Sequence, residues 1–251
     1  MNEALEGVEG FRVRQKLQIF EQFCYVCEKQ NEYYVGGLPQ GFRDGDQLRD
    51  EQFQDLKSEE ILHLQEHSTC CCRVCCGNAR EFTMDAFPSM NNYNHSMFQF
   101  FRPFHCCFCC QEIFIRQGDE ELGHVECDCR CFRACCCGEF FFRVKQGDQT
   151  LGWIKHIEPC CCNCCTNCCA PSCLNEQWVD EILSPNEDEV VGFLRDHYPG
   201  LGMRCLADSD NYTLTFPANS TNEQKAIWLG GLMLIDFVFF EKEADQDGNS
   251  G

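Results

Sequence analysis

Cysteine is the residue type in this sequence that could carry out the most chemistry, and the chain contains 26 cysteines. Many are adjacent, as in Cys70-Cys71-Cys72 and Cys135-Cys136-Cys137. Adjacent cysteines are awkward partners for disulfides, which need particular Cα separations and directions. The first ten residues lack the basic segment and apolar run of a secretory signal. We therefore expect a reducing compartment and free thiols.

Several cysteine pairs have the spacing of zinc ligands. They are Cys72-x-x-Cys75, Cys161-x-x-Cys164 and Cys165-x-x-Cys168. The densest cluster lies between Cys160 and Cys173, and it could hold a metal ion as a small module. The alternative is that these cysteines are buried and act as small hydrophobic residues. The spacing alone leaves both open.

A second candidate for chemistry is the acidic pair Asp208 and Asp210. Carboxylates at alternate positions suit a hard cation such as calcium, because a turn can wrap around the ion. The segment departs from the EF-hand template, since Thr213 stands where that loop has its central glycine and no glutamate ends it. The alternative is an acidic turn at the edge of a strand.

The elements that must position these residues are mainly short strands. Gln117-Gly118-Asp119 followed by Leu122-Gly123 recurs as Gln146-Gly147-Asp148 followed by Leu151-Gly152. Each Gly-Asp is flanked by strand-like runs, and the second glycine marks a bend or a close backbone approach. A weaker third copy has Pro185-Asn186 as its turn. The repeat predicts three successive β-hairpins in an all-β barrel or sandwich.

The C-terminal part contains one long apolar run, Ala226 to Phe240, interrupted only by the charge of Asp236. As a helix the run would span about 22 Å, short of the ~30 Å hydrocarbon core of a bilayer. A core helix and a transmembrane anchor both fit a helix that is apolar all round. A core helix requires that Asp236 meets a donor from the barrel lining or lies near the barrel mouth, because an unpaired buried carboxylate costs several kcal/mol.

Charge limits the partners that the chain can have. The formal net charge is −20, which excludes a nucleic-acid partner and simple electrostatic docking on an anionic membrane.

The distribution of apolar and polar segments along the chain predicts one domain over residues 1–243, with an exposed polar insertion at residues 38–60 and a flexible acidic tail at 244–251. No nucleophile elbow, phosphate-binding loop or HExxH motif is present, so we expect no covalent catalysis.

Several segments together resemble the phospholipid scramblase family, in the order in which that family has them. They are Cys71 to Thr83, Phe104 to Ile115 with its C-C-x-C-C-x-E-I pattern, Asp208 to Tyr212, Phe216-Pro217, Lys225-Ala226 and Leu234 to Glu241. The resemblance implies a tubby-like fold, a closed twelve-stranded β-barrel around a central hydrophobic C-terminal helix.

The resemblance also implies site residues. The calcium site of the family falls on Asp208, Asp210, Tyr212, Leu214, Phe216 and Asn219, the third to fifth of which would offer mainly backbone carbonyls. Asn219 replaces the aspartate that the family usually has. The S-palmitoylation motif of the family falls on Cys106, Cys107, Cys109 and Cys110, and several acyl chains give stable membrane anchoring.

The resemblance implies a function as well. This function is calcium-promoted, ATP-independent movement of phospholipids in both directions between the leaflets, by a protein on the cytoplasmic face of a membrane such as the plasma membrane. Membrane phospholipids and cysteine-linked acyl chains are then its partners. The alternatives are a palmitoylated, non-catalytic tubby-like membrane adaptor and a cysteine-rich metal-binding module.

Overall fold

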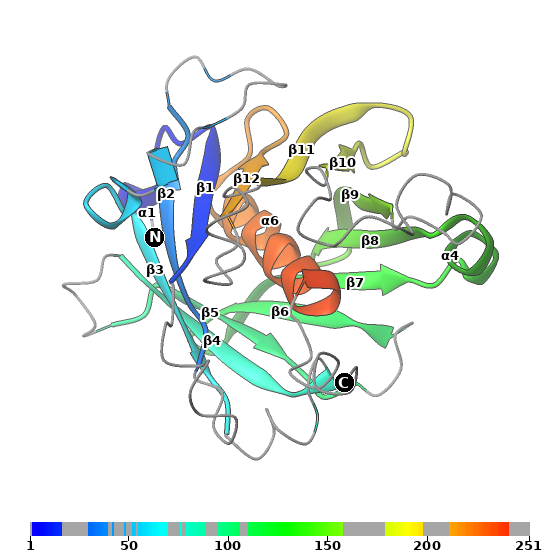
Figure 1. Ribbon diagram of the computed structural model, residues 1–251, viewed down its shortest axis with the longest axis horizontal. Coiled ribbons are helices and arrows are strands. Elements are labelled where there is room, and N and C mark those ends of the chain that lie inside the picture. The colour runs from blue at the N-terminus through cyan, green and yellow to red at the C-terminus, as the bar shows by residue number, and fades with distance from the viewer. Residues whose placement is uncertain are drawn as a thin grey trace, which may run out of the picture.

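Twelve antiparallel strands close into a barrel, in which each strand pairs with its neighbours in sequence and β1 pairs with β12 (Figure 1). The computed structural model describes residues 2–16, 30–39, 42, 48, 52–53, 55–69, 76, 79–88, 95–105, 110–157, 179–197 and 211–240. The strands are β1 (Gly10–Gln15), β2 (Glu32–Gly37), β3 (Leu62–His67), β4 (Phe82–Phe87), β5 (Phe98–Arg102), β6 (Glu112–Gln117), β7 (Glu120–Asp128), β8 (Glu139–Gln146), β9 (Gln149–Ile157), β10 (Val179–Leu183), β11 (Val190–His197) and β12 (Asn211–Thr215). The helices are α1 (Asn2–Leu5), the 3-10 turn η2 (Asp55–Lys57), α4 (Cys131–Cys137), α6 (Asn222–Ile235) and the π-helical turn η7 (Asp236–Phe240).

The three predicted hairpins are confirmed as β6–β7, β8–β9 and β10–β11. Gly118 and Gly147 have φ of 61° and 56°, the left-handed conformation that a tight hairpin turn needs and that glycine adopts without strain. The register of each hairpin shifts by one residue shortly after its turn, so each returning strand carries one extra residue, a β-bulge. The sequence repeat therefore encodes a structural repeat.

The second glycine of each copy marks a close approach between neighbouring elements. A Cβ on Gly123 would lie 2.4 Å from the carbonyl oxygen of Lys145 and 2.5 Å from a side-chain atom of Ile227 on α6. A Cβ on Gly152 would lie 2.5 Å from the carbonyl oxygen of Leu183. These glycines let the bulged strands approach both the next hairpin and the central helix.

The C-terminal helix α6 runs through the middle of the ring of strands (Figure 1) and fills the barrel. It begins with a capping box, in which Thr221 accepts from the backbone N–H of Gln224 and the Gln224 side chain accepts from the N–H of Thr221. From Lys225 onward every residue of α6 is buried. This confirms a core helix within a closed twelve-stranded barrel. Among the described residues, no helix has the combination of length and apolarity that a bilayer crossing requires.

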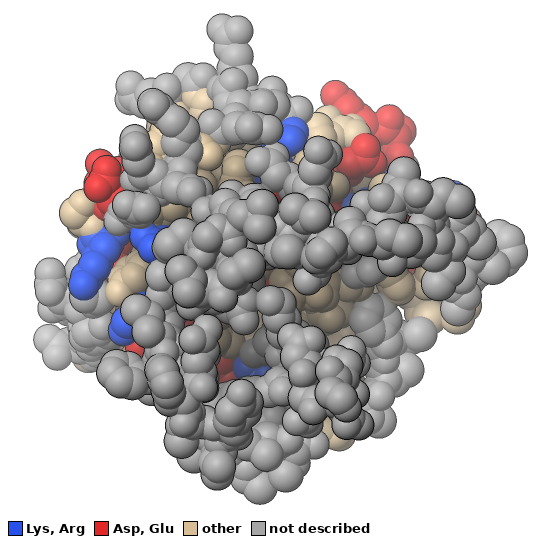
Figure 2. Space-filling model, viewed as in Figure 1, with Lys and Arg blue, Asp and Glu red and all other residues tan. Residues whose placement is uncertain are grey.

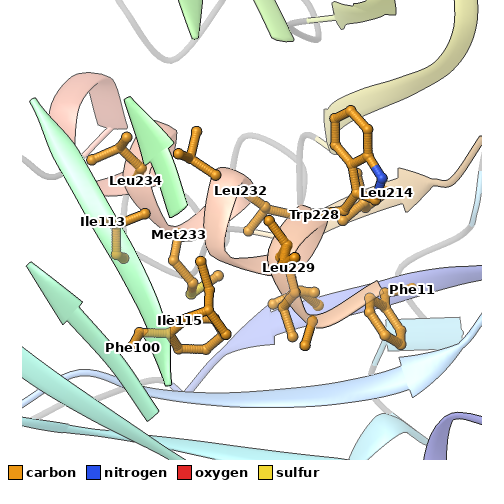
Figure 3. Packing of buried hydrophobic residues seen from close by; sticks show 14 of the residues in the cluster. Phe11, Phe100, Ile113, Ile115, Leu214, Trp228, Leu229, Leu232, Met233 and Leu234 are labelled. Carbon is orange, nitrogen blue, oxygen red and sulfur yellow. The ribbon is translucent and has the colours of Figure 1, made fainter. Parts of the chain in front are cut away.

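Side chains of the barrel wall point at α6 and contact it closely. Figure 3 shows Phe100, Ile113 and Ile115 of β5 and β6 on one side of the helix. A Cβ on Gly230 would lie 2.8 Å from the Ile115 side chain, and a Cβ on Gly231 would lie 2.5 Å from a barrel-wall isoleucine of β9. The Gly-Gly pair thus gives the wall side chains room against the helix backbone.

The polar segment 38–60 is not exposed along its whole length, so that expectation is wrong for two of its residues. Phe53 and Leu56 are buried and form a small cluster with Tyr34 on the outside of the barrel. Arg14 of β1 donates to the carbonyl oxygen of Phe53 (3.2 Å). The centroids of the Phe53 and His197 rings lie 5.3 Å apart. Burial lowers the pKa of His197 to about 4. Apolar side chains thus attach parts of this segment to the barrel. The acidic tail at residues 244–251 lies outside the described residues.

Candidate functional site

Two of the segments that the sequence singles out connect strands at the same end of the barrel. In a barrel of sequential antiparallel strands, successive connections alternate between the two ends. The connections β5–β6, which contains Cys106 to Cys110, and β11–β12, which contains Asp208 and Asp210, therefore attach at the same end. The helix α6 starts at the opposite end, after β12, and runs back through the barrel to the end where these two connections attach. We call the end that carries these two connections the helix-exit end.

Only part of the predicted calcium segment lies within the described residues. Asp208 and Asp210 lie outside the described residues. Tyr212 and Leu214 lie on β12 with fully buried side chains, and β12 pairs with β1 on one side and β11 on the other. Phe216 follows the strand and packs edge-on against the Phe11 ring, at 4.7 Å.

Asn219 lies in the turn before α6, with φ of 63°. It therefore lies beyond the end of β12, while Asp210 directly precedes its start, and five strand residues extend over roughly 16 Å. The structure does not bring Asn219 together with the start of β12. Calcium binding stays a prediction that rests on Asp208 and Asp210.

The palmitoylation motif is represented in the described residues only by Cys110, which is exposed. Cys106, Cys107 and Cys109 lie outside them. The chain that leads into the motif is apolar and accessible, since Phe104 is 51% exposed. The metal prediction for Cys160 to Cys173 also falls outside the described residues. Within the described ranges, no group of three or more His, Cys, Asp or Glu side chains is placed to hold a metal ion.

Asp236, the charge inside the apolar run, is buried where α6 ends. The hydroxyl of Tyr33 on β2 donates to its Oδ2 at 2.6 Å, and the hydroxyl of Tyr212 on β12 donates to its Oδ1. The prediction that this carboxylate meets donors from the barrel lining is confirmed. Tyr212, whose backbone carbonyl the family resemblance offers to calcium, uses its side chain to hold the end of the helix.

Aromatic and charged side chains surround the turn η7 at the helix-exit end. Phe237 stacks on Phe82, with ring centroids 4.1 Å apart, and the guanidinium of Arg80 lies 5.0 Å from the Phe237 ring. Arg80 Nε donates to Glu66 Oε1 at 3.1 Å, and both side chains are buried. Buried charges need this kind of mutual satisfaction, so the network holds the turn in place.

A buried histidine lies on the other side of the same turn. The ring of His156 stacks on Phe239, with centroids 3.8 Å apart, and its Nδ1 lies 2.8 Å from Asp180 Oδ1. Sequence reasoning missed Glu66, Arg80 and Asp180 as members of this site. Their partners come from other segments of the chain, and no spacing within one strand indicates them. The arrangement is suited to sealing a barrel mouth.

Comparison with known proteins identifies the family. A model of the Scramblase family matches residues 52–242, which include β3 to β12 and α6. The chain belongs to the Scramblase family. The strands β1 and β2, which close the barrel, precede the matched region.

Curated Scramblase relatives agree with this assignment. Phospholipid scramblase 1 of Rattus norvegicus is 30% identical over 200 residues, which is 77% of this chain and 54% of that protein. Phospholipid scramblase 1 of Homo sapiens is 30% identical over 200 residues, 77% of this chain and 57% of that protein. Phospholipid scramblase 2 of Bos taurus is 30% identical over 186 residues, which is 73% of this chain and 58% of that protein. The chain thus spans little more than half the length of these relatives. No solved structure matches it significantly.

Proposed function

We propose that this protein moves phospholipids in both directions between the leaflets of a membrane, without ATP and promoted by calcium. The observation that carries the proposal is the Scramblase match, which covers ten of the twelve strands and the central helix. The similar proteins are named phospholipid scramblases 1 and 2, which supports the same substrate class. The protein would act from the cytoplasmic face, for instance of the plasma membrane.

Acyl chains are the proposed means of attachment. A net charge of −20 disfavours adsorption to an anionic leaflet. The apolar helix α6 is buried inside the barrel, so it does not contact lipid. Thioester-linked acyl chains on Cys106, Cys107, Cys109 and Cys110 would supply the missing affinity, because two or more chains hold a protein on a bilayer stably. Exposure of Phe104 and Cys110 supports access to this segment.

Calcium would act at Asp208 and Asp210. Neutralising these two carboxylates lowers the repulsion between the helix-exit end and anionic lipid, so the ion would favour contact with the membrane. With two carboxylates available from this segment, we expect weak affinity.

The filled barrel constrains the mechanism and favours a second candidate. Because α6 occupies the interior of the described barrel, lipids must move along the outside of the protein and not through it. The same observation suits an acylated adaptor that binds membranes and other proteins without moving lipid.

Purified protein in liposomes that carry a fluorescent lipid in one leaflet tests the proposal and separates the two candidates. We expect calcium to accelerate exchange of the labelled lipid, and the Asp208→Asn, Asp210→Asn variant to lose most of this acceleration. Asp119→Asn, Asp148→Asn is the matched control, because it removes two exposed carboxylates from hairpin turns at the opposite end. Wild-type protein without calcium-dependent exchange would support the adaptor.

The acylation proposal predicts the behaviour of a variant in which Cys106, Cys107, Cys109 and Cys110 are all alanine. We expect it to lose these acyl chains and a large part of its membrane-bound fraction in cells, because little else attracts so acidic a chain to lipid. Hydroxylamine-dependent mass tagging counts the acyl groups, and fractionation measures the attachment. An unchanged number of tags would place the lipid on other cysteines.

The metal-binding alternative for Cys160 to Cys173 makes a separate prediction. Protein purified without added metal would carry zinc or another soft metal ion in stoichiometric amount. Elemental analysis measures this directly, and metal-free protein that keeps its fold excludes a structural metal.

A further inference from the structure

The outer wall of β5 and β6 carries two aromatic rings and an arginine. Phe100 and Ile115 point inward at α6 (Figure 3). Because successive side chains of a strand alternate between the two faces of a sheet, Phe101, Phe114 and Arg116 lie on the outer face. Phe101 and Phe114 are opposite one another in register, with ring centroids 6.4 Å apart. All three outward side chains are partly accessible to solvent.

The guanidinium of Arg116 lies over both rings. Its central carbon is 4.6 Å from the centroid of Phe101 and 5.5 Å from that of Phe114. Stacking on aromatic rings restricts the side chain and leaves the N–H groups at the edge of the guanidinium for other partners. Within the described part of the chain, Arg116 has no hydrogen bond and no ion pair. This is notable in a protein with 40 acidic and 20 basic residues.

The carboxylates nearest to Arg116 in the sheet have other partners. Glu121 is opposite Arg116 in register, across a β-bulge, and its Oε1 lies 3.2 Å from Nδ1 of His124. Gln99, opposite Arg116 on β5, donates to Asp85 at 2.9 Å. An external anion would therefore not need to displace an internal one from the guanidinium.

Arg130 shows what the same arrangement does elsewhere in this protein. Its guanidinium lies 4.0 Å from the centroid of the Phe141 ring and 5.0 Å from that of Trp153. Its two Nη atoms donate to the two carboxylate oxygens of Glu187, at 2.7 and 2.6 Å. Aromatic rings support the guanidinium, and its fork binds an anion through two parallel hydrogen bonds. Arg116 has the same aromatic support, and no carboxylate of the described residues binds to it.

The surroundings of Arg116 suit the phosphate group of a lipid. The connection from β5 to β6 begins with apolar, accessible chain, since Phe104 is 51% exposed, and it contains the exposed Cys110 near its end. The segment proposed to be acylated thus joins the two strands that carry the site. A phospholipid presents a phosphate beside apolar chains, and a guanidinium flanked by phenyl rings is complementary to both parts. Because α6 fills the barrel, lipid must move along an outer wall such as this one.

The β10–β11 hairpin has the opposite character. Asp188 and Glu189 are exposed in its turn. Figure 2 shows acidic side chains gathered at the upper right, where Figure 1 places this hairpin. A phosphate group is repelled there by like charge.

We propose that Arg116, supported by Phe101 and Phe114, binds the phosphate group of a phospholipid on the outer wall of β5 and β6. The inference takes its substrate class from the proposed function and adds where on the barrel the lipid is held. The guanidinium donates to the two non-bridging phosphate oxygens, and the two rings contact the apolar part of the lipid beside them. Because every phospholipid has this phosphate, the site recognises the class and not one headgroup.

Titration of the purified full chain with dihexanoylphosphatidylcholine, below its critical micelle concentration, tests the site. Backbone amide NMR signals of β5 and β6 report the dissociation constant. We expect Arg116→Ala to weaken binding at least about tenfold, because a charge-assisted pair with two hydrogen bonds is lost. Arg116→Lys keeps the charge but not the fork, so we expect an affinity between those of the wild type and Arg116→Ala.

Arg143→Ala is the matched control. Arg143 on β8 also lies over an aromatic ring, 4.7 Å from the centroid of Trp153, but its guanidinium lies 3.7 Å from Glu126 and 3.9 Å from Asp128. We expect Arg143→Ala to leave the lipid affinity unchanged. Thermal melts establish that the variants keep the fold, since both arginines lie on the outer wall.

Inorganic phosphate is the second probe, and we expect it to bind more weakly than the lipid because it offers nothing to the two rings. An Arg116-dependent affinity for inorganic phosphate that equals that for the lipid would show a site for free anions and overturn the proposal. An unchanged lipid affinity in Arg116→Ala, or an equal loss in Arg143→Ala, overturns it as well. The titration contains no bilayer and no calcium, so it is independent of lipid exchange. Protein that binds the lipid at Arg116 but exchanges none in liposomes contradicts the proposed function and not this site.

Discussion

Replacing Asp236 with alanine is expected to lower the free energy of unfolding by about 2–5 kcal/mol, because two buried hydroxyl groups lose their acceptor at once. The donors are Tyr33 and Tyr212, both fully buried, and they come from β2 and β12 on either side of β1. The carboxylate thus connects the end of the helix to the strands flanking β1, the strand at which the barrel closes. Urea unfolding followed by circular dichroism measures the change.

A mutant cycle separates this network from the simple loss of packing. Tyr33→Phe, Tyr212→Phe removes both donors, and in that background Asp236→Ala is expected to cost much less than in the wild type, since no tyrosine hydroxyl is left unsatisfied. Asp236→Asn retains one acceptor oxygen and is expected to fall between the wild type and Asp236→Ala. Equal costs of Asp236→Ala in both backgrounds would show that the two hydrogen bonds do not contribute.

The second large effect is expected at the close approaches of the hairpins. Gly123→Ala is expected to lower the free energy of unfolding by about 3 kcal/mol or more, because overpacking a well-filled core costs roughly 1–3 kcal/mol and here the new methyl group also meets backbone. Its Cβ would lie 2.4 Å from the carbonyl oxygen of Lys145, which belongs to the neighbouring strand and cannot rotate away. Gly152→Ala is expected to behave alike, with the Leu183 carbonyl at 2.5 Å.

Gly147→Ala is the matched control for these substitutions. Its turn is open, with no atom within 4 Å of the added Cβ, but its φ of 56° is left-handed. The expected cost is therefore the conformational term alone, about 1–2 kcal/mol. Thermal melts of the three variants rank them. A Gly147→Ala variant that is destabilised as much as Gly123→Ala would contradict the steric account.

Local features of the fold could be predicted from the sequence because their causes are local. Gly118-Asp119 and Gly147-Asp148 encode tight turns through a conformation that glycine adopts freely, so both hairpins and their repeat were predicted. The apolar run Ala226 to Phe240 predicted a helix, although its place in the core or in a membrane stayed open. The resemblance to the scramblase family supplied the number of strands and the closure of the barrel.

Long-range pairing could not be predicted in the same way. Tyr33 and Asp236 are 203 residues apart, and only closure of the barrel brings the hydroxyl to the carboxylate. The pairing of β3 with β4 places Glu66 opposite Met84, near the start of β4, and this brings it within reach of Arg80, which precedes the strand. Phe53 and Leu56 stand in a polar segment, and only the outer wall of the barrel offers them an apolar partner.

The same distinction between local and long-range causes applies to the candidate site. The sequence by itself determined the chemistry that is available: thiols in clusters, two carboxylates at Asp208 and Asp210, and a net charge that repels anionic lipid. Only the tertiary structure decided where the segments that carry this chemistry attach to the barrel. Successive connections of an antiparallel barrel alternate between its ends, so the connections whose sequences contain cysteine attach at one end and the tight acidic turns lie at the other. The same alternation places Asn219 beyond the far end of β12 from Asp210, because a strand separates along its length what the sequence writes close together.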